Sequence, residues 1–398
     1  MHSARPMHDD VEMKMLLFAI LISGCAVPAA SQPSPTIALS TTVRATATPR
    51  PSPTPALAEI RGGSIQLLTP SIGWVFSSAG LERTDDGGAT WRVVNAAETF
   101  GALRFVDAQR GWATLLAAPL GRAAHEGCAQ PPSGPCEVLA TTSDGGRTWT
   151  DRIVVPAPLG ISPFVIQAID SRVAWAIVSN AKCAPDGCIA ELRKTTDGGA
   201  TWTTQRSGDM QGLRMADAQH GWLTISRAPA NGADVLATTD GGATWTKVFT
   251  TNITVVSIDA ANTNDAWLLT RDGAFCTASN CSSYELFATH DSGHTWSSLG
   301  NPKDFACSGG HLVGPLFASP SIGWFGLTLG AGGGAGTGGV MRTDDGGRNW
   351  TCMTMPTNVG LVNAADPLNV WVRSDRREDA TSALYATADG GRVWRQIR

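Results

Sequence analysis

The chain has 398 residues, of which 16% are charged, and its formal net charge at pH 7 is −4. Nothing in this composition indicates the basic stripe with which a nucleic-acid-binding protein neutralises phosphates, so we expect no nucleic-acid partner. Glycine occurs 44 times and tyrosine twice, and no long segment places apolar residues at helical spacing, so the composition favours an all-β chain with many tight turns.

A short apolar segment lies close to the N-terminus. Lys14 precedes residues 15–24, which are mainly apolar and end directly before Cys25. The segment is shorter than the ~20 residues that span a bilayer, and it is typical of a signal-peptide core. Residues 22–25, Ile-Ser-Gly-Cys, resemble the bacterial lipobox, and this resemblance implies that Cys25 is lipidated. We interpret residues 1–24 as a lipoprotein-type signal peptide; cleavage nearby, an uncleaved anchor and a start at Met13 are the alternatives.

The next segment, residues 25–58, consists mostly of proline, serine, threonine and alanine. Such a composition cannot bury a core and predicts a disordered linker. If Cys25 carries a lipid, the linker holds the folded part of the chain away from the membrane.

An eight-residue segment, Thr-Asp-Asp-Gly-Gly-Ala-Thr-Trp at 84–91, is the first of seven similar copies. The others lie at 142–149, 195–202, 238–245, 289–296, 343–350 and 387–394, and we refer to all of them as boxes 1 to 7. Asn349 and Val393 stand where the other boxes have threonine. Aspartate bonds readily to backbone N–H groups of its own turn, and glycine supplies the positive φ of a tight hairpin. Each box therefore predicts a turn between two strands.

The aspartates of the boxes are interpreted as structural. A calcium loop places oxygen ligands at alternating positions and adds a distal carboxylate, and the boxes lack that pattern. We predict neither a metal ion nor a cofactor. The structural aspartates are Asp86, Asp144, Asp197, Asp240, Asp291, Asp345 and Asp389.

A second tryptophan recurs upstream of every box, within a short apolar strand. These residues are Trp74, Trp112, Trp175, Trp222, Trp267, Trp324 and Trp371. Each repeat thus holds four strands, which is the content of a propeller blade, and the second tryptophan is expected to pack between blades. The sequence predicts an all-β fold, a seven-bladed β-propeller of four-stranded antiparallel blades, over residues 59–398. No strand is left over, so the ring is expected to close by packing of blade 1 against blade 7, unless the first strand is shared differently.

The boxes resemble the Asp-box, or BNR, repeat of sialidases and of photosystem II stability and assembly factors. The assembly-factor resemblance implies a non-enzymatic scaffold that binds proteins. The sialidase resemblance implies an arginine triad, a tyrosine nucleophile with a glutamate partner, and an aspartic acid. The candidates Tyr284 and Tyr385 are not clearly placed at a central funnel, and the Arg-Ile-Pro motif is missing. We therefore predict no catalytic residues.

Strand directions alternate within a blade, so the first turn and the box share one face. The remaining loops lie on the opposite face, and their lengths vary. The longest are 117–137, 180–191, 272–284, 330–339 and 374–382. Because rigid scaffolds carry function on such loops, this loop face is the predicted binding surface, unless the insertions are drift.

Apart from Cys25, the chain has eight cysteines. Three close pairs fall in loops of the loop face, and disulfides are the simplest interpretation because zinc motifs are absent. The predicted pairs are Cys128 with Cys136, Cys183 with Cys188, Cys276 with Cys281 and, by elimination, Cys307 with Cys352.

Together these features predict a monomeric extracytoplasmic lipoprotein, attached to the cell membrane through its lipid anchor. Its loop face would bind a protein or a glycan such as a cell-surface polymer. A sialidase-like glycoside hydrolase is the alternative function.

Overall fold

The computed structural model describes residues 60–117, 136–156, 164–184, 187–227, 232–272, 283–306, 311–328, 338–355, 358–374 and 382–398. The predicted signal peptide, Cys25 and the linker lie outside these residues. Residues Ala56–Arg398 form one compact unit. Within the described part of the chain, no helix is both long and apolar enough to cross a membrane.

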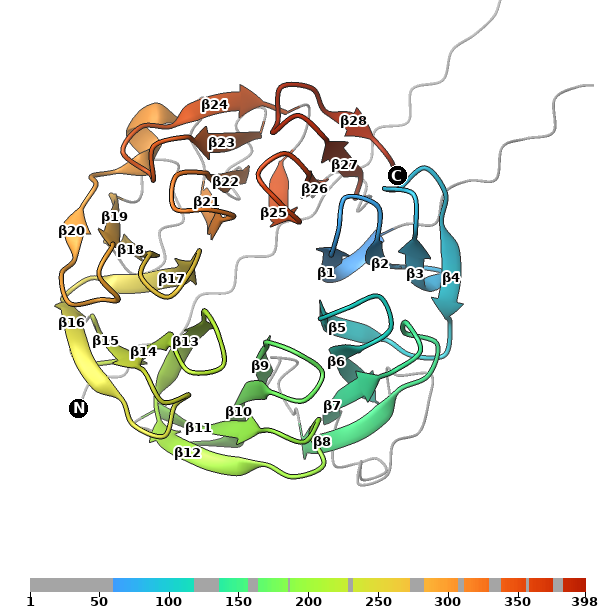
Figure 1. Ribbon diagram of the computed structural model, residues 1–398, viewed down its shortest axis with the longest axis horizontal. Helices are drawn as coiled ribbons and strands as arrows, with labels where there is room; N and C mark the ends of the chain where they lie inside the picture. Colours follow the sequence, from blue (N-terminus) through green and yellow to red (C-terminus); the bar gives the residue numbers. More distant parts are fainter. Residues whose placement is uncertain are drawn as a thin grey trace, which may run out of the picture. The chain divides into compact units, whose positions relative to one another are not determined.

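The unit is a β-propeller, which confirms the predicted fold. Seven antiparallel sheets of four strands each follow one another along the chain and form a ring (Figure 1). The first strand of each blade lies nearest the centre and the fourth lies at the rim. Between blades 5 and 6 the described chain also forms a short 3-10 helix, Pro302–Phe305.

The strands of the first four blades are as follows. Blade 1 contains β1 (Ile60–Leu67), β2 (Gly73–Ser77), β3 (Gly80–Thr84) and β4 (Arg92–Asn95). Blade 2 contains β5 (Phe100–Phe105), β6 (Gly111–Ala117), β7 (Cys136–Thr142) and β8 (Thr150–Pro156). Blade 3 contains β9 (Phe164–Ala168), β10 (Ala174–Ala184), β11 (Gly187–Thr195) and β12 (Thr203–Gly208). Blade 4 contains β13 (Met210–Met215), β14 (Gly221–Ser226), β15 (Ala233–Thr238) and β16 (Thr246–Thr251).

The remaining three blades repeat the same order. Blade 5 contains β17 (Thr254–Ala260), β18 (Ala266–Arg271), β19 (Tyr284–Thr289) and β20 (Ser297–Ser298). Blade 6 contains β21 (His311–Phe317), β22 (Gly323–Thr328), β23 (Gly339–Thr343) and β24 (Thr351–Thr354). Blade 7 contains β25 (Val359–Ala364), β26 (Val370–Ser374), β27 (Leu384–Thr387) and β28 (Arg395–Gln396).

The second-strand tryptophans pack between neighbouring blades, as predicted. All seven are at most 2% exposed. A separate apolar cluster fills each of the seven junctions; the one between blades 1 and 2, for example, joins Trp74 and Leu81 to Phe105 and Leu115. Burial of these large rings supplies much of the free energy that holds the blades together.

The ring closes without exchange of a strand, because β1–β4 and β25–β28 are separate sheets. Side-chain packing between blades 7 and 1 closes it, as expected, with Trp371 and Leu384 against Ile65 and Val75. Polar contacts fix the register of this junction: Asn363 Oδ1 accepts a hydrogen bond from the Leu67 backbone N–H at 2.7 Å.

Candidate functional site

Each box is a self-contained turn. In box 4, Thr238 Oγ1 donates to Asp240 Oδ1 at 2.9 Å and accepts from the Gly242 N–H at 2.8 Å. Asp240 also accepts the Thr244 backbone N–H at 2.9 Å and its hydroxyl at 2.6 Å. The Thr244 hydrogen bonds, followed by that from Thr238, lower the pKa of the Asp240 carboxyl to about 2.

The two variant boxes show how the turn tolerates substitution. Asn349 replaces the threonine hydroxyl with its amide, which donates to Asp345 Oδ2 at 2.7 Å. Val393 retains only the backbone bond to Asp389 Oδ1, at 3.0 Å. The box carboxylates thus serve their own turns, and among the described residues no group of three His, Cys, Asp or Glu could hold a metal ion.

The boxes and the first turns lie on one face of the propeller, which we call the box face. In every blade a box N–H donates to a first-turn carbonyl, as Gly241 does to Gln219 at 2.7 Å and Ser292 to Asn264 at 3.1 Å. Both turns keep the same length in all seven blades. Length varies among the opposite loops, which span 78–79 in blade 1 but 118–135 in blade 2.

Much of the predicted loop face lies outside the described residues, together with Cys128, Cys276, Cys281 and Cys307. Backbone pairing places Cys183 opposite Cys188 where β10 meets β11. Cys352 on β24 is disulfide-bonded. The four cysteine pairings of the sequence analysis nevertheless stay predictions.

Polar side chains lie on the first strands at the positions paired with the buried tryptophans. These are Gln66, Arg104, Gln167, Arg214, Asp259 and Asn363, with Leu316 completing the set.

Several members of this set bind the neighbouring blade. Asp259 Oδ2 accepts the Phe317 N–H at 2.6 Å, and Arg214 Nε lies 2.9 Å from Asp259 Oδ1. Burial raises the pKa of the Asp259 carboxyl, and the Arg214 charge opposes this rise. Sequence reasoning missed this arrangement, because its only signal is a polar residue near the end of an otherwise apolar strand.

The two tyrosines do not reach the centre of the ring. Tyr284 is 1% exposed in the core between blades 5 and 6, and Tyr385 is 7% exposed in the core between blades 6 and 7. The Tyr284 hydroxyl accepts the Leu312 N–H at 3.4 Å. A tyrosine nucleophile needs an accessible hydroxyl, and both tyrosine side chains are buried.

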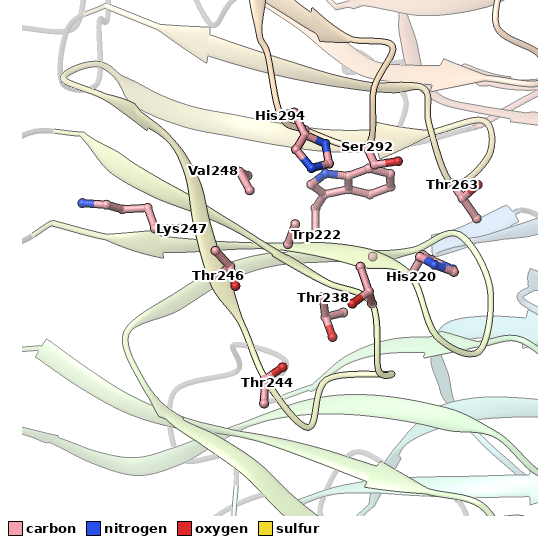
Figure 2. Close-up of a pocket in the computed structure, with 14 residues that line it drawn as sticks. His220, Trp222, Thr238, Thr244, Thr246, Lys247, Val248, Thr263, Ser292 and His294 are labelled. Carbon is pink, nitrogen blue, oxygen red and sulfur yellow. The ribbon is translucent and has the colours of Figure 1, made fainter.

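A cavity of about 400 Å³ opens on the box face between blades 4 and 5. Trp222, Thr238 and His220 line it from blade 4, and Ser292 and His294 line it from box 5 (Figure 2). Trp222 is 1% exposed, and its Nε1–H has no hydrogen-bond partner in the described part of the chain. A smaller cavity of about 230 Å³ lies between blades 2 and 3.

No protein-family model matches the sequence, and no curated protein matches it. Solved structures are similar in fold. A GH74 enzyme from Niastella koreensis has a TM-score of 0.53 and 13% identity, over 85% of this chain and 66% of its own. A prolyl endopeptidase structure has a TM-score of 0.56 and 12% identity, over 85% of this chain and 49% of its own. YCF48 bound to D1 peptide has a TM-score of 0.49 and 18% identity, over 80% of this chain and 91% of its own.

The present chain therefore spans less than two thirds of the GH74 enzyme and about half of the endopeptidase. At such low identities the similarity to these enzymes establishes the propeller fold and no activity.

Proposed function

We propose that this protein is a non-enzymatic binding propeller. Its loop face would bind a protein or a cell-surface polymer outside the cytoplasmic membrane, and a lipid on Cys25 would anchor it. The observation that carries the proposal is the contrast between the faces: the turns of the box face have one length in every blade, whereas the opposite loops differ in length. A rigid frame with variable loops on one side is the usual architecture of a binding scaffold.

The glycoside hydrolase alternative fits the structure less well. A sialidase-type mechanism requires a tyrosine nucleophile, and both Tyr284 and Tyr385 are packed inside interblade cores. Asp259 is engaged by Arg214 and by the Phe317 N–H, so it holds blades 4, 5 and 6 together. Assay of the full chain against a panel of chromogenic glycosides tests this alternative, and turnover that survives Tyr284→Phe and Tyr385→Phe would require a different nucleophile.

The binding proposal is tested by exchanging one loop. Residues 118–135 would be replaced with the two-residue connection of blade 1, Ser78-Ala79, which joins equivalent strands. Pull-down from the native envelope should lose its captured partner with this variant. A matched substitution on the box face of the same blade, Gln109→Ala, should leave capture intact. Capture unaffected by exchange of each long loop in turn would refute the loop face as the binding surface.

The anchor is tested separately. Cys25→Ala should move the protein from the membrane fraction to the soluble fraction, since a lipidated cysteine would supply the attachment. Membrane retention of the variant would refute lipid anchoring at Cys25 and leave the proposed binding face untouched.

A further inference from the structure

On the box face, the chain's own basic side chains fill the space beside several buried tryptophans. Between blades 3 and 4, Lys194 Nζ lies 4.9 Å from the centre of the Trp175 ring. It also donates to the Gly241 carbonyl of box 4 at 2.9 Å. Lys194 thus combines a cation–π contact with a hydrogen bond to the next blade.

At two other junctions an arginine makes both contacts, one with the tryptophan ring and one with a carbonyl of the next blade. Arg83 lies 5.0 Å from the Trp74 ring and donates to the carbonyl of Ala108, in the first turn of blade 2. Arg342 lies 5.7 Å from the Trp324 ring and donates to the Gly390 carbonyl of box 7 at 2.5 Å.

All three cations directly precede a box threonine. We call the space that they occupy the cation slot.

Two further junctions receive a cation from the strand that follows the box. Between blades 2 and 3, Thr141 stands before the box, and Arg152 of β8 donates to its hydroxyl at 2.9 Å. Between blades 7 and 1, Arg395 donates to the Gly87 carbonyl of box 1 at 3.2 Å. Between blades 5 and 6, Ala288 precedes the box, and the carbonyl of Gly346 accepts the Trp267 indole N–H at 2.8 Å. The carbonyls of Gly145 and Gly241 accept the same kind of bond at junctions that do contain a cation.

At the junction between blades 4 and 5, neither the position of Lys194 nor that of Arg152 holds a cation. Ala237 precedes box 4, where Lys194 precedes box 3, and Val248 takes the position of Arg152. The cavity of about 400 Å³ occupies the space left free, and Ala237, Val248 and Trp222 line it.

The acceptors of the slot are still present. Ser292 and Thr263 of blade 5 stand at the positions of Gly390 and Pro367, whose carbonyls accept from Arg342, and both line the cavity. Among the described residues, no donor contacts either of these two carbonyls.

Ser292 has a backbone conformation that is unusual for a residue with a side chain. It has a φ of 64°, where the other boxes have glycine. A Cβ added to the equivalent Gly241 would lie 2.3 Å from Lys194 Nζ, so the Ser292 Cβ takes part of the space that the lysine ammonium takes between blades 3 and 4. The charged group of a ligand in this cavity would lie against the Ser292 hydroxyl, whose oxygen can accept a hydrogen bond.

Three basic side chains line the cavity, and each has a contact of its own; His294 Nδ1 contacts the Asp291 carbonyl oxygen. Lys247 extends away from Trp222 (Figure 2), and its Nζ lies 3.9 Å from Asp234 Oδ2. His220 Nδ1 lies 2.9 Å from the Asp217 carboxylate. The indole N–H of Trp324 also lacks a partner, although Arg342 lies over its ring. The unpartnered Trp222 N–H is therefore not itself a sign of a missing ligand.

We propose that the cavity between blades 4 and 5 is a vacant cation slot that binds an arginine or lysine side chain of another protein. Trp222 would pack against the side chain, and the Thr263 carbonyl and the Ser292 hydroxyl oxygen would accept its hydrogen bonds. The site lies on the box face, so it does not depend on the loop-face function proposed above.

The probes are Nα-acetyl-arginine amide and its neutral isostere Nα-acetyl-citrulline amide, titrated into the full chain. Indole N–H signals in an NMR spectrum report binding, and loss of one signal in Trp222→Phe identifies Trp222. The arginine probe should shift this signal with weak affinity, and the citrulline probe should bind at least about tenfold more weakly, because it lacks the charge.

Three variants sharpen the test. Ala237→Lys should fill the slot and abolish binding, whereas Thr141→Lys, the same substitution at the same position of blade 2, should leave it unchanged. Lys194→Ala should create a second site, with a shift of the Trp175 signal. Equal binding of the two probes, no binding of either, or binding that survives Ala237→Lys would overturn the proposal; circular dichroism and the melting temperature would show that each variant is folded.

Discussion

Arg398 and Glu82 form a buried, bidentate ion pair across the junction that closes the ring. Both nitrogen–oxygen distances are 2.5 Å, and the two side chains are 3% and 7% exposed. The Arg398 guanidinium also lies 5.6 Å from the Trp91 ring. The pair joins β3 of blade 1 to the end of blade 7, beside the C-terminus in Figure 1.

Arg398→Ala should destabilise the propeller by about 3–5 kcal/mol, because Glu82 would remain buried without its partner. The double variant Glu82→Gln/Arg398→Met should recover part of this loss, since no charge is left buried. Urea unfolding measures both free energies.

The control for this ion pair is Arg395→Ala. Arg395 is exposed and donates to the Gly87 carbonyl at 3.2 Å. Its loss should cost at most about 0.5 kcal/mol, as for most exposed surface positions. Equal effects of the two single variants would contradict a special role for the buried pair.

Val393→Thr should stabilise box 7. The new hydroxyl can donate to Asp389 Oδ2, as Thr244 does to Asp240 at 2.6 Å, and an exposed valine is removed. We expect the melting temperature to rise by about 1–2 °C. The reverse substitution in box 4, Thr244→Val, should lower it by a similar amount, and a rise in both variants would mean that the hydroxyl bond is not the cause.

Stability should remain insensitive to the box carboxylates from pH 7 down to about pH 4. Their hydrogen bonds to threonine lower the pKa of Asp86, Asp240 and Asp291 to about 2 in the folded protein, from the ordinary value of 3.8. Between about pH 2 and pH 3.8 the unfolded chain binds more protons than the folded one. The stabilisation by the ionised box carboxylates is therefore complete above pH 3.8 and is lost as the pH falls through about 2.

Urea midpoints measured from pH 7 to pH 2 check this dependence, and Asp240→Asn should flatten it slightly. A main loss of stability near pH 6 would instead indicate titration of histidines.

Ser292→Gly should stabilise the protein by up to about 1 kcal/mol. A left-handed φ of 64° strains a serine but not a glycine. Loss of the 2.9 Å bond from Ser292 Oγ to Asn264 Oδ1 offsets part of this gain. Ser292→Ala, which keeps the strain and loses the bond, should be less stable than both, and thermal unfolding of the three proteins ranks them.

Local sequence determined a large part of this molecule. The box residues predict the turns because each one bonds within its own segment, as Thr238 and Asp240 do. The alternation of box and upstream tryptophan sets the four strands of a blade, and seven copies set the ring. These features depend on contacts between residues that are close in the chain, so a single sequence reveals them.

Only the tertiary structure decided how the blades meet. Glu82 and Arg398 are 316 positions apart, and the ring geometry alone brings them together. Asp259 contacts Arg214 in the preceding blade and Phe317 in the following one, although nothing in its own strand indicates either partner. Ala237 is an ordinary strand residue in the sequence. It marks a cavity because the neighbouring blade presents Thr263 and Ser292 to the space that a lysine or arginine fills elsewhere in the ring.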